Sequence, residues 1–327
     1  MRTIYSGEQL VGRKIPYVEL YNFITQPPLN ILFEAEPDAF QLDYDNQNNI
    51  QAFQVEAYTE FKQKGKMHKD SVAVRLEDFK IGRKNIRMKI RKANYSLQVK
   101  SHLVLDWKNK HLKEIGIDTY RGYLCAKYGN KLPPLDTKFL SNSIGISIVI
   151  YFESDGKLMP YLPFRSKAIF NKKKYEPALC EGVYATSSSG VLEWNCSNES
   201  FTFEYVKEEM YREIKEEIGL DKEDLIYMDI LAITRELLRA GKPQMFFIGI
   251  TKLNETELIE KRKNAIEANK KDKTQKIEIK DKHLSSSDIN SMFNTKLLSL
   301  ELIGNLYYCE NYLIENKEEL DKRFSVS

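Results

Sequence analysis

Residues 212–220, with the sequence REIKEEIGL, bring together three glutamates at a spacing that could do chemistry. If this segment is a helix, residues three and four apart are neighbours, so Glu213, Glu216 and Glu217 share one patch. Like charges at this spacing destabilise a helix by about 0.2–0.5 kcal/mol per pair. Arg212 can brace one carboxylate, but a single guanidinium does not neutralise three. The pattern therefore indicates a site for a hard divalent cation such as Mg²⁺, which prefers oxygen ligands.

The same residues have a plainer interpretation. Acid-rich helix faces are common on protein surfaces, and Lys207 and Lys215 could pair with the glutamates on a solvated face. The helix itself is predicted from about Phe203 to Ile218, because apolar residues recur there at spacings of three and four. Gly219 is suited to end it in a left-handed conformation. Charge alone leaves both a metal site and a solvated face open.

This segment resembles the closing half of the Nudix box, a motif of hydrolases that act on diphosphates. Residues 212–220 match every fixed position of Arg-Glu-apolar-x-Glu-Glu-x-Gly-apolar, and Glu204 lies eight residues before Arg212, where the family pattern has an earlier glutamate. The family's glycine, six residues earlier still, is replaced by Asn198. The preceding loop is expected to be enlarged, and two glycines in it could do part of the missing glycine's work: Gly182 and Gly190.

The resemblance covers about residues 138–313 and implies an α/β fold, the Nudix α/β/α sandwich with a mixed sheet. It implies that Mg²⁺ or Mn²⁺ is held by Glu213, Glu216 and Glu217, with Glu204 in supporting range and Arg212 orienting one of the glutamates. The implied reaction is attack of water on phosphorus in a nucleoside diphosphate derivative, helped by metal ions that neutralise phosphate charge. The alternative is a Nudix-fold module that binds a nucleotide or signalling oligonucleotide with little or no turnover.

Further site residues are less sharply indicated, and each has an ordinary structural alternative. Substrate phosphates need fixed cations, for which the candidates are Arg165, Arg235, Arg239 and Lys242. A general base could come from a later loop, at Glu278 or Asp281. A nucleotide ring could stack on an aromatic side chain, the candidates being Phe164, Tyr184 and Trp194.

The elements that must position the box follow from hydrophobic patterns. Residues 144–152, IGISIVIYF, are typical of a buried strand, and the turn ESDGK followed by LMPYLPFR predicts a hairpin. Residues 171–200 lack periodicity and predict a long loop. LIYMDILAIT and PQMFFIGIT predict two strands after the box, and 297–313 predicts a closing helix. The charged residues 253–283 predict a solvated helix or a mobile insertion.

The first 132 residues predict a small α+β domain of unknown role. The run YGNKLPPLD near residue 130 cannot continue a helix or a central strand, so a boundary is placed there, before a second domain at 138–327. Within the first domain, 18–24 reads as a helix, 52–61 alternates in the manner of a strand, and further strands are predicted in 71–79, 85–93 and 97–107.

Charge is unevenly distributed along the 327 residues, although the formal net charge is only +3. Residues 60–114 hold sixteen Lys and Arg against six acids, whereas residues 1–59 hold eight acids and three bases. A basic strand face could contact nucleic acid or another polyanion, with Tyr95 or Trp107 stacking on bases. The alternative is a solvated sheet face that offsets the acidic start of the chain.

Composition excludes several other classes of protein. No run approaches the roughly 20 apolar residues that span a bilayer, and the polar start MRTIYSGEQL lacks the apolar core of a signal peptide, so no membrane is expected and the cytoplasm is the expected compartment. The four cysteines are scattered without a CxxC pair, which indicates neither zinc nor a disulfide framework. A nucleotide-type substrate and a homodimer are the expected partners.

Overall fold

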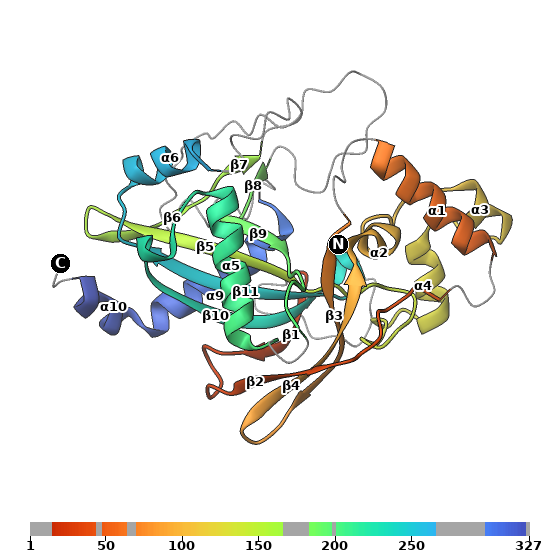
Figure 1. The fold of residues 1–327 in the computed structure, drawn as a ribbon, viewed down its shortest axis with the longest axis horizontal. Helices are drawn as coiled ribbons and strands as arrows, with labels where there is room; N and C mark the ends of the chain where they lie inside the picture. The colour runs from red at the N-terminus through yellow and green to blue at the C-terminus, as the bar shows by residue number, and fades with distance from the viewer. Residues whose placement is uncertain are drawn as a thin grey trace.

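The structure is a computed structural model that describes residues 15–43, 48–63, 70–165, 183–197, 201–265 and 298–324, with the side chains of 165 and 321–324 left out. The fold is mixed α/β (Figure 1). The main sheet runs in the order β1-β10-β11-β5-β6, with β9 also paired to β5. Its strands are β1 (Tyr17–Asn22), β5 (Gly145–Ser154), β6 (Lys157–Tyr161), β9 (Ser188–Val191), β10 (Leu225–Glu236) and β11 (Lys242–Thr251).

The main sheet is mixed because β11 and β5 pair in parallel while its other pairs are antiparallel. Helix α5 (Phe203–Glu217) packs on one face, where Ile146 and Ile148 of β5 join Ile214 in one core. Helix α9 (Leu300–Glu315) packs on the other face, where Val149 joins Leu302. Strand β5 is therefore covered on both faces, which explains its continuous apolar sequence.

Helix α5 confirms the predicted helix in its extent and in its ends. The Thr202 side chain accepts a hydrogen bond from the Tyr205 N–H and caps the first turn. Gly219 follows the last turn with φ +80°, and its N–H reaches the carbonyl of Ile214 at 3.2 Å. The cap fixes the direction in which the chain leaves the glutamate-bearing turns.

The strands predicted around the box are confirmed, but the long loop predicted at 171–200 is wrong in part. Within it, β8 (Val183–Tyr184) pairs with β7 (Phe164–Arg165), and β9 pairs with β5. The sequence TSSSG reads as a loop because it lacks apolar side chains, yet strand pairing needs only backbone groups. Residues 171–182 and 198–200 lie outside the described residues.

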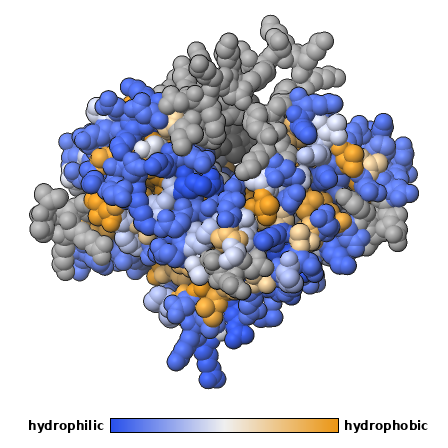
Figure 2. Space-filling model, in the orientation of Figure 1, coloured by the Kyte–Doolittle hydropathy of each residue, from blue (hydrophilic) through white to orange (hydrophobic). Residues whose placement is uncertain are grey.

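The first part of the chain forms a second sheet in the order β2-β4-β3, flanked by short helices. Its elements are β2 (Asn30–Ala35), α1 (Asn48–Gln63), β3 (Val72–Ile81), β4 (Asn85–Asn94), α2 (Tyr95–Ser101), α3 (Lys110–Glu114) and α4 (Tyr120–Tyr128). Strands β3 and β4 confirm the predictions at 71–79 and 85–93. The hairpin that joins them projects at the bottom of Figure 1, and its tip is hydrophilic in Figure 2.

Three predictions in this part of the chain are wrong. Residues 18–24 were expected to be helical, but β1 forms instead because pairing with β10 overrides local propensity. Residues 52–61 lie in α1, whose buried residues Ile50, Phe53 and Ala57 have helical spacing. Residues 97–101 of the strand predicted at 97–107 belong to helix α2.

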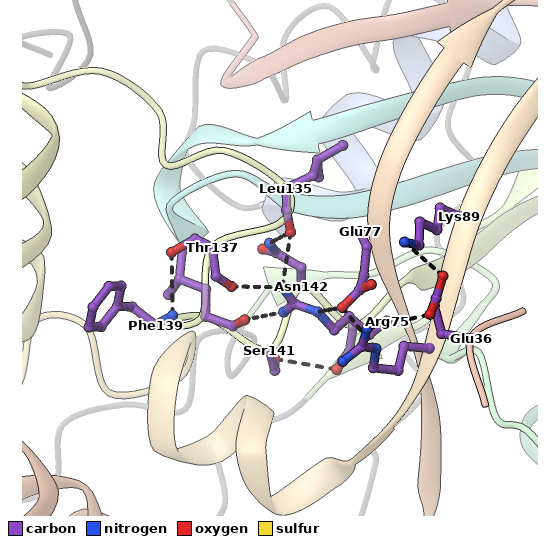
Figure 3. A network of polar contacts seen from close by, with 12 residues as sticks. Glu36, Arg75, Glu77, Lys89, Leu135, Thr137, Phe139, Ser141 and Asn142 are labelled. Carbon is purple, nitrogen blue, oxygen red and sulfur yellow. Dashed lines mark hydrogen bonds and ion pairs between the residues drawn. The ribbon is translucent and has the colours of Figure 1, made fainter. Parts of the chain in front are cut away.

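The two halves of the chain are joined by hydrogen bonds across the boundary predicted near residue 130. β1 pairs with β10, so the first half supplies the edge strand of the main sheet. Arg75 of β3 is fully buried, and its guanidinium donates to the carbonyls of Leu140 and Thr137, the latter at 2.7 Å (Figure 3). A division into two domains stays a prediction.

Helix α6 (Glu255–Lys263) forms the described beginning of the charged region predicted at 253–283, and residues 266–297 lie outside the described residues. A last helix, α10 (Lys317–Phe324), follows α9. In the described part of the chain, no helix is both long and apolar enough to cross a bilayer.

Candidate active site

The glutamates of α5 are arranged around one guanidinium. Arg212 Nη2 lies 2.7 Å from Glu213 Oε1 and 3.0 Å from Glu209 Oε2, and its Nη1 lies 3.2 Å from Glu216 Oε1. Glu209 was not predicted, although it lies three residues before Arg212 on the same helix face. We call Glu209, Arg212, Glu213, Glu216 and Glu217 the box cluster. It holds four carboxylates and one cation.

Glu213 is more enclosed than Glu216, with 14% of its side chain exposed against 32%. Its carboxylate lies over β9 at Gly190, where an added Cβ would come within 2.5 Å of it. Burial raises the pKa of Glu213 to about 8; the Arg212 charge opposes this rise, and the charges of Glu217 and Glu216 add to it. A side chain at 190 would require this carboxylate to move, and a role for Gly190 in place of the missing box glycine stays a prediction.

The backbone of β9 holds a second glutamate. The Ser189 N–H donates to Glu217 Oε2 at 2.8 Å. This contact exists because Ser188–Val191 pairs with Gly145–Ile148 of β5, which places β9 beneath the last turns of α5. Glu216 has 32% of its side chain exposed. The site therefore combines the side chains of a helix with a backbone group of a strand. The spacing of acidic residues in the sequence does not reveal that strand.

The chemistry of this donor set suits Mg²⁺ or Mn²⁺, because carboxylate oxygens are the ligands that hard divalent cations prefer. The excess of acids over Arg212 is the charge that such an ion would balance. In the arrangement observed, Arg212 and the Ser189 N–H bind the carboxylates, and across the described residues no three His, Cys, Asp or Glu side chains gather to hold an ion.

Glu204 lies outside the box cluster. It occupies the first turn of α5, nine residues before Glu213, which corresponds to roughly 13 Å along the helix axis. The structure therefore brings Glu213, Glu216 and Glu217 together with Arg212, and leaves Glu204 near the other end of the helix. A supporting role for Glu204 in metal binding stays a prediction.

The three basic side chains predicted around the β10–β11 turn are buried, and they contact other groups of the protein. Arg235 donates to the carbonyls of Gly241 at 2.9 Å and Pro133 at 2.6 Å. Arg239 Nη1 lies 3.0 Å from Glu301 Oε1, and its Nε lies 3.5 Å from Glu236 Oε1. These contacts hold the turn and the start of α9. A role in substrate binding stays a prediction.

Lys242, the third of these cations, is 2% exposed and donates to Gln244 at 3.3 Å. The pKa of Lys242 is lowered to about 8, first by burial and then by the nearby Arg239 charge, while Glu301 and Glu236 oppose the shift. Lys242 is therefore part of a buried charged group at the end of the main sheet. We call Glu236, Arg239, Lys242 and Glu301 the turn cluster.

Other predicted site residues are packed or lie outside the description. Phe164 and Tyr184 make an edge-to-face contact at 5.1 Å, and Trp194 is 4% exposed with its ring 4.8 Å from that of Phe201. These aromatic contacts are those of a core. Residues that were candidates but whose side chains lie outside the described residues are Arg165, Gly182, Asn198, Glu278 and Asp281.

The basic segment is accompanied by acids. Lys89 pairs with Glu36 at 2.7 Å, and Lys80 pairs with Asp78 at 2.6 Å. Arg91 Nε lies 3.1 Å from Glu77. This pairing is what the interpretation as a charge-balanced sheet face expects, whereas contact with nucleic acid or another polyanion stays a prediction.

A cavity of about 620 Å³ lies away from the box cluster. Its lining comes from the segment after β2, from α1, from the outer face of β3 and β4, and from residues 136 and 138, with no residue of α5 or β9. It holds side chains of both signs, among them Asp43, Glu77, Arg91 and Lys138. Size alone does not make it the active site, because its lining sets three acids against two cations, whereas the box cluster sets four acids against one.

Comparison with known proteins gives little to add to this geometry. No family model and no curated protein matches the chain. Among solved structures, the chain is similar to a mutT/nudix family protein from Listeria innocua, with 22% identity over 38% of this chain and 73% of that one, and a TM-score of 0.26. A similarity this slight supports no argument about activity.

Proposed function

We propose that the protein is a metal-dependent hydrolase of the Nudix type that cleaves the diphosphate linkage of a nucleoside diphosphate derivative, on an α/β/α sandwich formed by α5, the main sheet and α9. The observation that carries the proposal is the box cluster itself. Three carboxylates share one guanidinium on a partly exposed helix face, a fourth, that of Glu217, is held by the Ser189 N–H, and Gly190 keeps a strand close to them without filling the space. Such an excess of acids is costly unless a cation balances it.

The residues have distinct tasks in this proposal. Glu213, Glu216 and Glu217 would hold Mg²⁺ or Mn²⁺. Arg212 orients Glu213 and Glu216, and the Ser189 N–H orients Glu217. When bound, the ion would supply charge neutralisation for phosphate oxygens and make water more acidic. Water attacks phosphorus, a new P–O bond forms, the anhydride P–O bond breaks, and each product keeps one phosphate end.

The test is a panel of nucleoside diphosphate derivatives with product identification, in Mg²⁺ and in Mn²⁺. Glu216→Gln and Glu217→Gln are expected to lower turnover about 100-fold or more, because each removes a charge that positions the ion. Glu208→Gln is the matched control, since Glu208 is on the same helix but pairs with Lys222 at 2.5 Å. Unchanged turnover in both box variants contradicts the proposal.

A second outcome would favour the binding module. If the wild-type protein turns over no member of the panel but is thermally stabilised by a nucleotide, the fold binds without catalysis. The observation that points this way is that, among the described residues, no three His, Cys, Asp or Glu side chains gather to hold an ion.

A further inference from the structure

The cavity of about 620 Å³ on the outer face of β3 and β4 has the size of a small-molecule site. Such sites have volumes of about 300–1,000 Å³. Apart from Phe40 and Leu42, the lining is polar or charged, and three side-chain amides contribute to it: Gln41, Asn48 and Gln51. The cavity therefore suits a hydrophilic ligand that carries hydrogen-bonding groups of its own.

Arg75 of β3 lies next to the cavity and ties its two sides together. Its guanidinium carbon lies 3.7 Å from the centre of the ring of Phe40, a lining residue. Its Nη2 donates to the carbonyls of Leu135 at 3.1 Å and Thr137 at 2.7 Å, the two residues that flank Asp136 (Figure 3). Because Arg75 is fully buried and hydrogen-bonded, it fixes the position of β3 relative to residues 135–137.

One side of the cavity has an excess of positive charge. It is formed by Glu77 and Arg91, which line the cavity, with Arg75 beside them, and we call these three residues the strand side. Glu77 Oε1 lies 3.2 Å from Arg75 Nε and 3.1 Å from Arg91 Nε, so one carboxylate serves two guanidinium groups. Arg91 Nη2 also lies 3.8 Å from Glu36, but Glu36 pairs more closely with Lys89, at 2.7 Å.

Arg91 has donors that no protein group takes. Its buried Nε makes no hydrogen bond, and among the described residues no acid pairs with its Nη1. Arg91 lies directly opposite Arg75 in the β3–β4 register, which brings two like charges close together. The pKa of Arg75 is lowered to about 10, first by burial and further by the Arg91 charge, while Glu77 and Asp136 oppose the lowering. An anionic group beside Arg91 would offset this repulsion.

The other side of the cavity has an excess of negative charge. It is formed by Asp43, Asp136 and Lys138, which we call the loop side. Lys138 Nζ lies 3.6 Å from Asp43 Oδ2, and the Asp43 N–H donates to the Lys138 carbonyl at 2.9 Å. Lys138 is therefore engaged by one acid. Asp136 is exposed, and no cation of the described residues forms an ion pair with it.

We propose that this cavity binds a peptide-like zwitterion, with the carboxylate of the ligand at Arg91 and its ammonium group at Asp136. The strand side and the loop side have opposite charge excesses, so a ligand with one charge of each sign complements both. A guanidinium binds a carboxylate through two parallel hydrogen bonds. The three lining amides offer donors and acceptors to amide groups between the two charges. Because no residue of α5 or β9 lines the cavity, this inference does not depend on the proposed function.

The experiment tests three pools of dipeptides with polar side chains against the whole chain. One pool is zwitterionic, one is N-acetylated and lacks the ammonium group, and one is amidated at the C-terminus and lacks the carboxylate. Binding is read from the unfolding midpoint and from saturation-transfer NMR. The zwitterionic pool at about 5 mM is expected to raise the midpoint, and each blocked pool is expected to give less than about half of that rise.

Two variants assign the two ends of the ligand. Asp136→Asn should lose the preference for the zwitterionic over the N-acetylated pool and keep the preference over the amidated pool, and Arg91→Gln should do the reverse. The matched controls are Asp118→Asn, an exposed acid outside the cavity, and Arg87→Gln, on the same strand as Arg91 with 60% of its side chain exposed. Both controls should behave as the wild type does.

Three results would each overturn the inference: no rise in midpoint with the zwitterionic pool, equal rises with all three pools, or variants that behave as their controls do. Arg91 also pairs with Glu77, so Arg91→Gln could disturb the fold. Asp136 is exposed and its replacement by Asn keeps the size of the side chain, so Asp136→Asn decides the matter if Arg91→Gln does not fold.

Discussion

The box cluster and the turn cluster are built from the same residue types and differ in balance and burial. The turn cluster pairs two acids with two cations, and Glu236 and Lys242 are almost fully buried. The box cluster sets four acids against Arg212, with 31% of the Arg212 side chain and 32% of the Glu216 side chain exposed. A balanced, buried group can hold a fold together. An unbalanced, accessible one is suited to a cation from solution.

The largest effect is expected from breaking the turn cluster. Glu236→Gln leaves Arg239 and Lys242 with less compensation in a site that water does not reach, and removing one member of a buried charged group costs about 3–5 kcal/mol. Equilibrium urea unfolding would measure the loss of unfolding free energy. A loss below about 1 kcal/mol would show that this cluster is not what holds the turn.

His102 extends the same comparison to pH. Its Nδ1 lies 2.7 Å from the Arg239 carbonyl, and its Nε2 accepts from the Asn142 N–H at 3.1 Å, so the ring is held neutral. Burial lowers the pKa of His102 to about 3; its hydrogen bond to the Arg239 carbonyl opposes this, and the Lys242 and Arg239 charges add to the lowering.

Above the unfolded-state pKa of about 6.5, His102 is neutral in both states and costs nothing. As pH falls from about 6.5 toward about 3, His102 becomes protonated in the unfolded state but stays neutral in the folded state. The free energy of unfolding should therefore fall by up to about 1.4 kcal/mol per pH unit. The measurement is urea unfolding at a series of pH values. His102→Gln should remove this part of the slope, and an unchanged slope would contradict the assignment.

Gly190→Ala tests the contact between β9 and the box cluster. The added Cβ would meet the Glu213 carboxylate at 2.5 Å. That carboxylate is the end of a flexible side chain and can move, so we expect a loss of only about 1 kcal/mol in unfolding free energy, together with a loss of turnover. The double variant Gly190→Ala with Glu213→Ala should recover most of the stability, because it removes the clash. Additive losses in this cycle would mean that the two residues do not meet.

The smallest effect is expected from Glu216→Gln on stability. Removing one of several like charges should leave the unfolding free energy unchanged or raise it by up to about 0.5 kcal/mol, in contrast with Glu236→Gln. Thermal unfolding without metal is the measurement. A loss above about 1 kcal/mol would show that Glu216 stabilises the fold, as Glu236 is expected to do in the turn cluster.

Features that lie within one helix or strand can be predicted from the sequence, whereas features that depend on strand pairing cannot. The three glutamates and Arg212 lie on one helix, so their convergence follows from helical spacing, and the buried strands and α9 follow from continuous or periodic apolar residues. Ser189 and Gly190 enter the site only because β9 pairs with β5, and a short polar strand carries no pattern that would reveal it. Likewise, no pattern tells whether Arg235 contacts substrate or, as found, backbone carbonyls.

The same limit explains β1 and α1. The sequence of β1 has a helical pattern, but its backbone pairs with β10. The sequence of α1 alternates, but the residues that it buries lie on one face of a helix. Gly190 is already a candidate from its position in the long segment before the box. Its contact with Glu213 needed the structure.

The most direct test of the account is calorimetric titration of metal-free protein with Mg²⁺ and Mn²⁺. Saturable uptake is expected for the wild type and for Glu208→Gln, and its loss is expected in Glu213→Gln and Glu217→Gln. No saturable uptake by the wild type, or equal uptake by all four proteins, would contradict the claim that the box cluster exists to bind a divalent cation.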